Sequence, residues 1–159
     1  MAVRLRSGGD SAQALDSVRR AIQHLAAPGA SGDPTVLDQL AGSRALAALL
    51  LAEKGDRAGA LEEAGKGAEI GTSGLGGDAK YRGYGAIYWS RVGGMYESLA
   101  QIKDAPPDQR LADWRAARDA YQRSVAALRQ SVQIRRELGV PELESRIANC
   151  EKGIAGLTH

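Results

Sequence analysis

Glycine and proline divide the chain into six stretches, and within each the apolar residues recur at three- and four-residue steps. This spacing places apolar side chains on one face of an α-helix, so it predicts helix and not strand. The last stretch is the clearest, because Leu143, Ile147, Cys150, Ile154 and Leu157 form one apolar seam. The predicted helices span residues 10–26, 33–54, 57–70, 79–101, 109–138 and 141–157.

Residues at the ends of these stretches suit helix termini. Asp33-Pro34 reads as an N-cap followed by proline at the first helical position. Gly55 can end one helix in the left-handed conformation, and Asp56 can cap the next. The third helix carries Gly59, Gly65 and Gly67, each costing about 1 kcal/mol relative to alanine. We therefore expect this helix to be frail, or to let a neighbour approach very closely.

The amino-acid composition agrees with an all-helical domain. Alanine supplies 28 of 159 residues and leucine 17, valine and isoleucine together supply 14, and phenylalanine is absent. Alanine loses no side-chain entropy in a helix, whereas β-branched residues favour strands. A charged fraction of 25% beside 43% hydrophobic residues argues against disorder and against a membrane protein. We expect one domain at residues 10–159 after a flexible N-terminus at residues 1–9.

Charge and hydropathy disfavour several classes of partner. The formal net charge is only +2, which gives little support to a nucleic-acid or anionic-membrane partner. The most apolar run, residues 45–52, is far shorter than a bilayer span, and the N-terminus lacks the apolar core of a signal peptide. We predict no nucleic-acid partner and no membrane insertion. The expected location is cytoplasmic, or extracytoplasmic if the chain is part of a larger membrane-anchored protein.

The residue types needed for catalysis and metal binding are scarce. His24, His159 and Cys150 are the only histidines and the only cysteine, too few for a metal site built from these ligands. The glycine-rich stretch 71–78 lacks the Gly-Lys-Ser/Thr ending of a phosphate-binding loop. No spacing pairs a nucleophile with a base. We predict that the chain is not an enzyme and takes no cofactor or metal.

Two adjacent pairs of predicted helices share a pattern of small and aromatic residues. In the second pair, Trp89 to Tyr96 reads Trp-x-x-Val-Gly-x-x-Tyr, and Ala117 to Ser124 reads small-x3-aromatic-x2-small. The first pair carries a weaker version around Gly55-Asp56. On these motifs the chain resembles tetratricopeptide-repeat (TPR) proteins over roughly residues 11–138. Its C-terminal part is similar to degenerate repeats at the C-terminal end of bacterial serine/threonine kinases, although it has no kinase motif.

The resemblance implies an all-α fold, a right-handed stack of antiparallel helix pairs (a TPR-like α-solenoid) closed by a C-terminal capping helix. The first helix then resembles the second helix of an incomplete preceding repeat. Closely packed helices need small residues where their backbones meet, as at Ala48, Gly93 and Ala117, with aromatic rings filling the gap between pairs. A plain helical bundle with chance spacing stays open as the alternative.

The second pair departs from the family pattern in two ways. The turn between its helices, normally Gly-Asp, is stretched by about twelve residues through residues 101–112. The helix that follows overruns the usual repeat length beyond Val125.

The resemblance also implies a binding surface, because a TPR array holds a peptide on the concave face lined by its first helices. That face would offer Ala45, Leu49, Ala52 and Glu53 from the first pair, and Ile87, Ser90, Gly94, Glu97 and Ser98 from the second. Tyrosines beside Arg91 add a second signal, since tyrosine and arginine dominate interface hot spots. The candidate partner-binding residues are Leu49, Glu53, Tyr84, Ile87, Tyr88, Arg91 and Glu97.

We therefore expect a non-catalytic protein–protein interaction module, a scaffold of the kind used in bacterial signalling. The incomplete first repeat predicts an exposed apolar surface at the N-terminal end, and with it a homo-oligomer or a missing upstream segment. Two other functions stay open, a purely structural oligomerisation domain and an arginine-rich helical polyanion binder.

Overall fold

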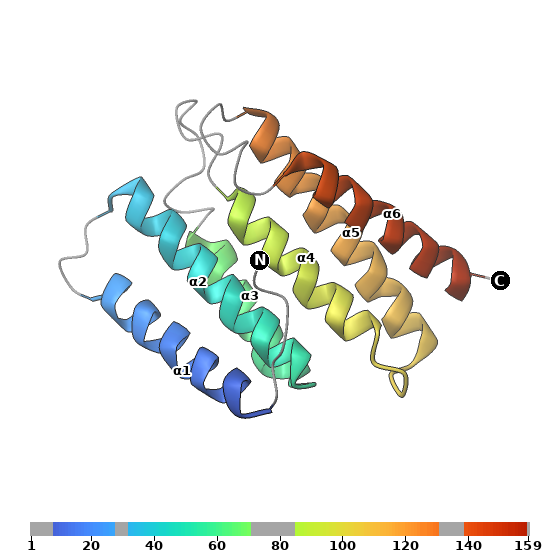
Figure 1. The fold of residues 1–159 in the computed structure, drawn as a ribbon, viewed down its shortest axis with the longest axis horizontal. Coiled ribbons are helices and arrows are strands. Elements are labelled where there is room, and N and C mark those ends of the chain that lie inside the picture. Colours follow the sequence, from blue (N-terminus) through green and yellow to red (C-terminus); the bar gives the residue numbers. More distant parts are fainter. Residues whose placement is uncertain (1–7, 28–31, 71–84, 131–138, 159) are drawn as a thin grey trace.

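The computed structural model in Figure 1 describes residues 8–27, 32–70, 85–130 and 139–158. Nearly all of these residues are helical, and the described part of the chain contains no strand, so the all-α prediction is confirmed. The helices are α1 (Gly8–Leu25), α2 (Pro34–Glu53), α3 (Arg57–Ile70), α4 (Ala86–Ala100), α5 (Pro107–Gln130) and α6 (Val140–Leu157).

Local capping explains the boundaries that agree with the sequence prediction. Asp33 Oδ1 accepts a hydrogen bond from the Thr35 N–H at 2.7 Å, immediately before α2 begins. Gly55 has φ of 81°, a conformation that favours glycine, and Asp56 Oδ1 accepts from the Gly59 N–H at 3.0 Å. As a result α3 begins where the sequence predicts.

Other boundaries differ from the prediction. Gly8 and Gly9, expected in the flexible N-terminus, belong to α1, whose first turn carries Asp10. The connection between α4 and α5 is residues 101–106, shorter than predicted, because Pro107 starts α5 where we read it as loop. Residues 79–84 of the predicted fourth helix and residues 131–138 of the predicted fifth lie outside the described residues.

Consecutive helices form antiparallel pairs. In the pair of α2 and α3, Arg44 Nη1 donates to Glu63 Oε2 at 2.9 Å. In the pair of α4 and α5, Ser124 Oγ donates to the Ala86 carbonyl at 2.7 Å, and Arg110 Nε donates to the Ala100 carbonyl at 2.9 Å. The start of α4 thus meets the late part of α5, and the end of α4 meets its beginning.

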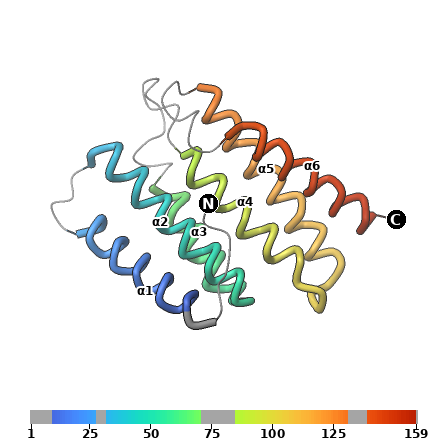
Figure 2. The backbone as a smooth tube through the Cα atoms, viewed as in Figure 1, coloured from blue at the N-terminus to red at the C-terminus, as the bar shows by residue number. Residues whose placement is uncertain are grey.

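The two end helices pack on these pairs. α1 packs against α2, and α6 packs against α5. Trp114, early in α5, meets Gly153, late in α6, while Arg129 Nη2 contacts Glu144 Oε1 at 2.9 Å. Thus α6 runs antiparallel to α5 and in the same direction as α4, as the backbone trace in Figure 2 shows.

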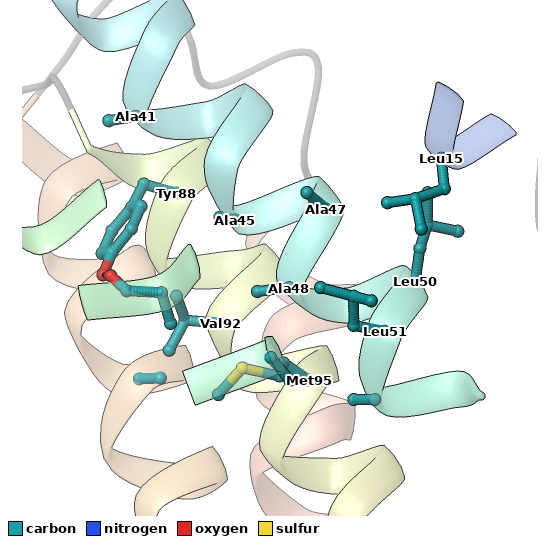
Figure 3. Packing of buried hydrophobic residues seen from close by; sticks show 14 of the residues in the cluster. Leu15, Ala41, Ala45, Ala47, Ala48, Leu50, Leu51, Tyr88, Val92 and Met95 are labelled. Carbon is teal, nitrogen blue, oxygen red and sulfur yellow. Dashed lines mark hydrogen bonds between the residues drawn. The ribbon is translucent and has the colours of Figure 1, made fainter. Parts of the chain in front are cut away.

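The core lies between the pairs and is built from alanine, leucine and aromatic side chains. Figure 3 shows alanines of α2, including Ala45 and Ala48, opposite Tyr88, Val92 and Met95 of α4. A second cluster joins α4, α5 and α6 around Tyr121, Leu128 and Cys150. Small residues therefore stand where helices α2 and α4 meet, whereas Ala48 was expected where the two helices of one antiparallel pair meet.

At three contacts a glycine gives an aromatic ring the room it needs. A Cβ atom at Gly93 would lie 2.5 Å from the Tyr121 ring, and one at Gly67 would lie 2.6 Å from the Tyr88 ring. A Cβ at Gly153 would lie 2.4 Å from Trp114. The close approach expected at α3 is therefore confirmed for Gly67, whereas Gly65 has no neighbour within 4 Å.

The apolar N-terminal surface that we expected is absent from the described residues. Leu15 and Ile22 of α1 are buried against α2, while Arg19, Arg20 and Gln23 are exposed. Within the described part of the chain, Leu61 of α3 is the only exposed large hydrophobic residue. The amphipathic α1 turns its apolar stripe toward α2. The homo-oligomer or missing upstream segment stays a prediction.

Helix α2 is the one described helix long and apolar enough to cross a membrane, judged by length and composition alone. It contacts α1, α3 and α4, and nine of its residues are buried. Contact with three neighbouring helices accounts for its apolar character within this fold.

Candidate functional site

Helices α2 and α4 lie side by side and run in the same direction. The Gly85 N–H donates to Asp38 Oδ1 at 2.8 Å, and Arg91 Nη1 donates to the Gly42 carbonyl at 2.7 Å. Further along, Gly94 faces Leu49. Residue numbers rise together on both helices, so the first helices of the two antiparallel pairs are parallel.

A groove follows the line between these helices. Its central hollow has a volume of about 670 Å³. It is lined by Ser11 of α1, by Leu46, Leu49 and Glu53 of α2, by Arg91, Gly94, Glu97 and Ser98 of α4, by Gln101, and by Arg146 of α6. Figure 1 shows α2, α4 and α6 forming the near side of the molecule, with α3 behind α2.

Two smaller hollows extend the central one, and we call all three together the α2/α4 groove. One hollow shares Arg91 with the centre and continues over Leu25, Asp38, Gln39, Gly42, Ser43 and Ile87. The other shares Glu53, Ser98 and Gln101 with the centre and continues over Ala52, Lys54, Gly55 and Ile102. Because neighbouring hollows share lining residues, the three hollows lie in a row along α4.

Helical periodicity supplies the lining from both helices. On α4 the lining residues between Ile87 and Ser98 follow steps of three and four, the spacing of one helix face. On α2, Leu46 and Leu49 form an apolar floor, and opposite them Gly94 has no side chain to fill the space. The groove thus has an apolar floor with polar groups around it.

One wall of the groove is held by a hydrogen-bonded cluster from α4, α5 and α6. The Tyr121 hydroxyl donates to Glu97 Oε2 at 2.6 Å. Arg146 Nη1 lies 3.3 Å from the Tyr121 hydroxyl and 3.5 Å from Glu97 Oε2. Burial, and then the hydrogen bond to Glu97, raise the pKa of the Tyr121 phenol above its ordinary value, so it stays a proton donor. The Arg146 charge is balanced by Glu97 and also by Glu142 at 3.5 Å.

The hollow that reaches Leu25, the last residue of α1, forms one end of the groove, which we call the α1 end. The titratable groups that line this hollow are Arg91 and Asp38. Burial lowers the pKa of Arg91, an effect that the charge of Asp38 partly offsets. Burial raises the pKa of Asp38, whereas the Gly85 hydrogen bond and the Arg91 charge lower it. The two groups do not form an ion pair in the described structure, because Arg91 is directed to the Gly42 carbonyl and Asp38 to the Gly85 amide.

The structure brings five of the predicted site residues together and separates one. Leu49, Glu53, Arg91 and Glu97 line the central hollow, and Ile87 lines its continuation. Tyr88 is 5% exposed, and its hydroxyl donates to the Ala64 carbonyl at 2.7 Å, so it belongs to the core and not to the surface. Tyr84 lies outside the described residues.

Other residues line the groove without having been predicted as partner contacts. Leu46 could have been found, since it lies three residues before Leu49 on the same helix face. Ser11 and Arg146 come from α1 and α6, whose positions depend on tertiary packing that no local spacing shows. Ala45, expected on this face, is fully buried in the core.

Groups outside the groove serve packing. Asp113 is 2% exposed, and both of its carboxylate oxygens accept from Arg57, at 2.7 and 2.9 Å, which joins α5 to α3. Cys150 is buried, and burial raises the pKa of its thiol to about 12. Among the described residues, no three His, Cys, Asp or Glu side chains gather where they could hold a metal ion.

Comparisons with protein-family models, with curated proteins and with solved structures find no match to this chain.

Proposed function

We propose that the chain is a non-catalytic protein-interaction module that binds an extended peptide segment of a partner protein in the α2/α4 groove. The observation that carries the proposal is the row of three hollows along α4. Its floor is apolar at Leu46 and Leu49, and its walls offer hydrogen-bonding side chains such as Ser98 and Gln101. Peptide sites combine these two features, because side chains bury apolar area while the peptide backbone needs polar partners.

The dimensions of the groove suit a short extended segment. Helix α4 has 15 residues, which at 1.5 Å each gives about 22 Å. An extended chain rises about 3.3 Å per residue, so six or seven residues would occupy this length.

The arrangement of the helices supports a TPR-like reading of the module. Two antiparallel pairs, α2 with α3 and α4 with α5, stack so that their first helices are parallel and line one face. A right-handed repeat stack needs this arrangement and presents such a face for binding. Helix α6 would then take the position of the first helix of a third pair. We propose that the module as a whole serves as a cytoplasmic signalling scaffold.

A peptide selection tests the proposal. Random 12-residue peptides displayed on phage are selected on the wild-type chain and then offered to two variants. Ser98→Trp places a large ring where two hollows meet, and Gln122→Trp places the same ring at an exposed site on α5. We expect Ser98→Trp to reduce retention of the selected peptides at least about tenfold, because hot-spot contacts dominate binding. Gln122→Trp should keep their retention.

Circular dichroism and thermal melting of both variants separate groove blocking from unfolding. Equal retention by wild type and Ser98→Trp would place binding elsewhere and contradict the proposal. A selection that enriches no peptide, with a chain that light scattering shows to be oligomeric, would favour the structural oligomerisation domain instead.

A further inference from the structure

Arg91 occupies the junction of the groove. Among the described residues it is the one that lines both the central hollow and the hollow at the α1 end. It is half-buried, and its Nη1 donates to the Gly42 carbonyl of α2 at 2.7 Å. A ligand lying along the groove therefore passes over this side chain.

The guanidinium keeps hydrogen-bonding capacity for a ligand. Arginine has five N–H donors, and Nη1 of Arg91 donates to the Gly42 carbonyl, a neutral acceptor. Arg146, the other cation of the central hollow, is balanced by contacts with two glutamates. Asp38 is the acidic group whose charge acts on the pKa of Arg91, and its Oδ1 accepts from the Gly85 amide. Of the two cations that line the central hollow, Arg91 is thus the one whose side-chain hydrogen bond in the described structure goes to an uncharged acceptor.

Apolar side chains lie on both sides of Arg91. Ile87 precedes it by four residues on α4, and Leu46 follows Gly42 by four residues on α2. A Cβ at Gly42 would lie 3.4 Å from Arg91 Nη1 and 3.5 Å from Ile87 Cγ2, so Ile87 lies beside the guanidinium itself. A bound peptide that meets Arg91 with one side chain thus has apolar surface of both helices within reach of its neighbouring side chains.

We propose that the groove selects an extended peptide with an acidic side chain on Arg91 and aliphatic residues close to that acid in the peptide sequence. This inference rests on the proposed peptide-binding function and names the ligand. The acidic side chain supplies the charge that Arg91 lacks in its contacts, and the aliphatic residues cover Ile87 and Leu46. A charge-assisted, bidentate arginine–carboxylate pair is stronger than a neutral hydrogen bond.

Two synthetic peptides test the inference by fluorescence polarisation. The probe is acetyl-Gly-Ser-Leu-Ser-Glu-Ser-Leu-Ser-Gly-amide carrying a fluorophore, and its partner has glutamine in place of glutamate. Both ends are blocked, so the carboxylate that differs is that of the side chain. We expect the wild type to bind the glutamate peptide about tenfold tighter or more, because hydrogen bonds to charged groups contribute more than neutral ones.

The variant Arg91→Gln should bind the two peptides equally, and Arg91→Lys should keep only part of the preference. Arg20→Gln, which removes an exposed arginine of α1 outside the groove, should keep all of it. The affinity of each variant for the glutamine peptide shows whether its groove is intact.

Three outcomes would overturn the inference. Equal binding of the two peptides by the wild type would remove the acid preference, and a preference that survives in Arg91→Gln would assign it to another residue. Failure of both peptides to bind would reject the pattern itself. In each case the phage selection still decides separately whether the groove binds peptides at all.

Discussion

At the residue scale, this fold depends on glycines, which leave room for aromatic rings to approach the backbone. Tyr121 is 1% exposed, and its ring lies against Gly93 where any other residue would place a Cβ atom. The hydroxyl of Tyr121 donates a hydrogen bond to Glu97 in the wall of the groove. One glycine therefore allows both the packing of α5 on α4 and the placement of a groove residue.

We expect Gly93→Ala to destabilise the protein by about 1–3 kcal/mol, because overpacking a core displaces side chains and backbone. The added Cβ would lie 2.5 Å from the Tyr121 ring. Urea unfolding followed by circular dichroism measures the change. Gly65→Ala is the matched control, since it makes the same substitution in a helix with nothing within 4 Å. Alanine should stabilise α3 there by up to about 1 kcal/mol. A Gly93→Ala protein as stable as wild type would contradict this account of the contact.

The sequence indicates some of these residues and hides others. Gly93 belongs to the motif that begins at Trp89, so its role as a close contact could be predicted from local spacing. The contact of Gly67 with Tyr88 joins two different helix pairs, and no spacing within either pair reveals it. Tyr88 was consequently read as a surface residue, although it is buried.

At the scale of elements, α6 contains one buried titratable group that makes the stability of the protein depend on pH. Cys150 of α6 is fully buried in the cluster that joins α5 and α6. Burial raises the pKa of its thiol from 9.0 to about 12. The folded state thus keeps a proton that the unfolded state loses above pH 9.

Stability should therefore fall as pH rises from about 9 toward 12, and it should be unaffected by Cys150 below that range. The loss from this one thiol approaches about 1.4 kcal/mol per pH unit. Burial also raises the pKa of Tyr88 from 10.0 to about 12, which adds to the loss above pH 10. Urea unfolding at pH 8 and pH 10 measures it. Cys150→Ala should show a smaller decline between these pH values, and an equal decline would refute the role of the thiol.

Helix boundaries could be predicted where a cap is local and failed where it is not. The Gly55-Asp56 turn contains its own left-handed glycine and its own capping carboxylate, so the start of α3 could be predicted. Pro107 was read as the end of a loop, although proline fits equally well at the first position of a helix. Proline can end one helix or begin the next, and only the packing around it determines which of the two occurs.

At the scale of the whole molecule, the groove combines parts that are far apart in the sequence. Ser11, Leu46, Gly94 and Arg146 line one hollow although they come from four helices. The charged residues in its lining are nearly balanced, with Glu53 and Glu97 beside Arg91 and Arg146. A surface of this kind favours short-range recognition over long-range attraction of a polyanion.

Salt dependence distinguishes these modes of binding. We expect the affinity for the glutamate peptide to fall no more than about fourfold between 50 and 200 mM NaCl, as a single ion pair requires. Peptide titrations at three salt concentrations measure this change. A much larger loss would contradict recognition through one ion pair.

The glycine–ring contacts have a consequence for how such a chain can evolve. Each contact pairs a glycine with a large aromatic residue, at positions 93 and 121, 67 and 88, and 153 and 114. A substitution by a larger residue at one position is tolerated only after a smaller residue has replaced its partner. The two positions of each pair should therefore covary among homologues. Homologous chains should therefore be recognisable by these three covarying couples, even after their surface residues have been replaced.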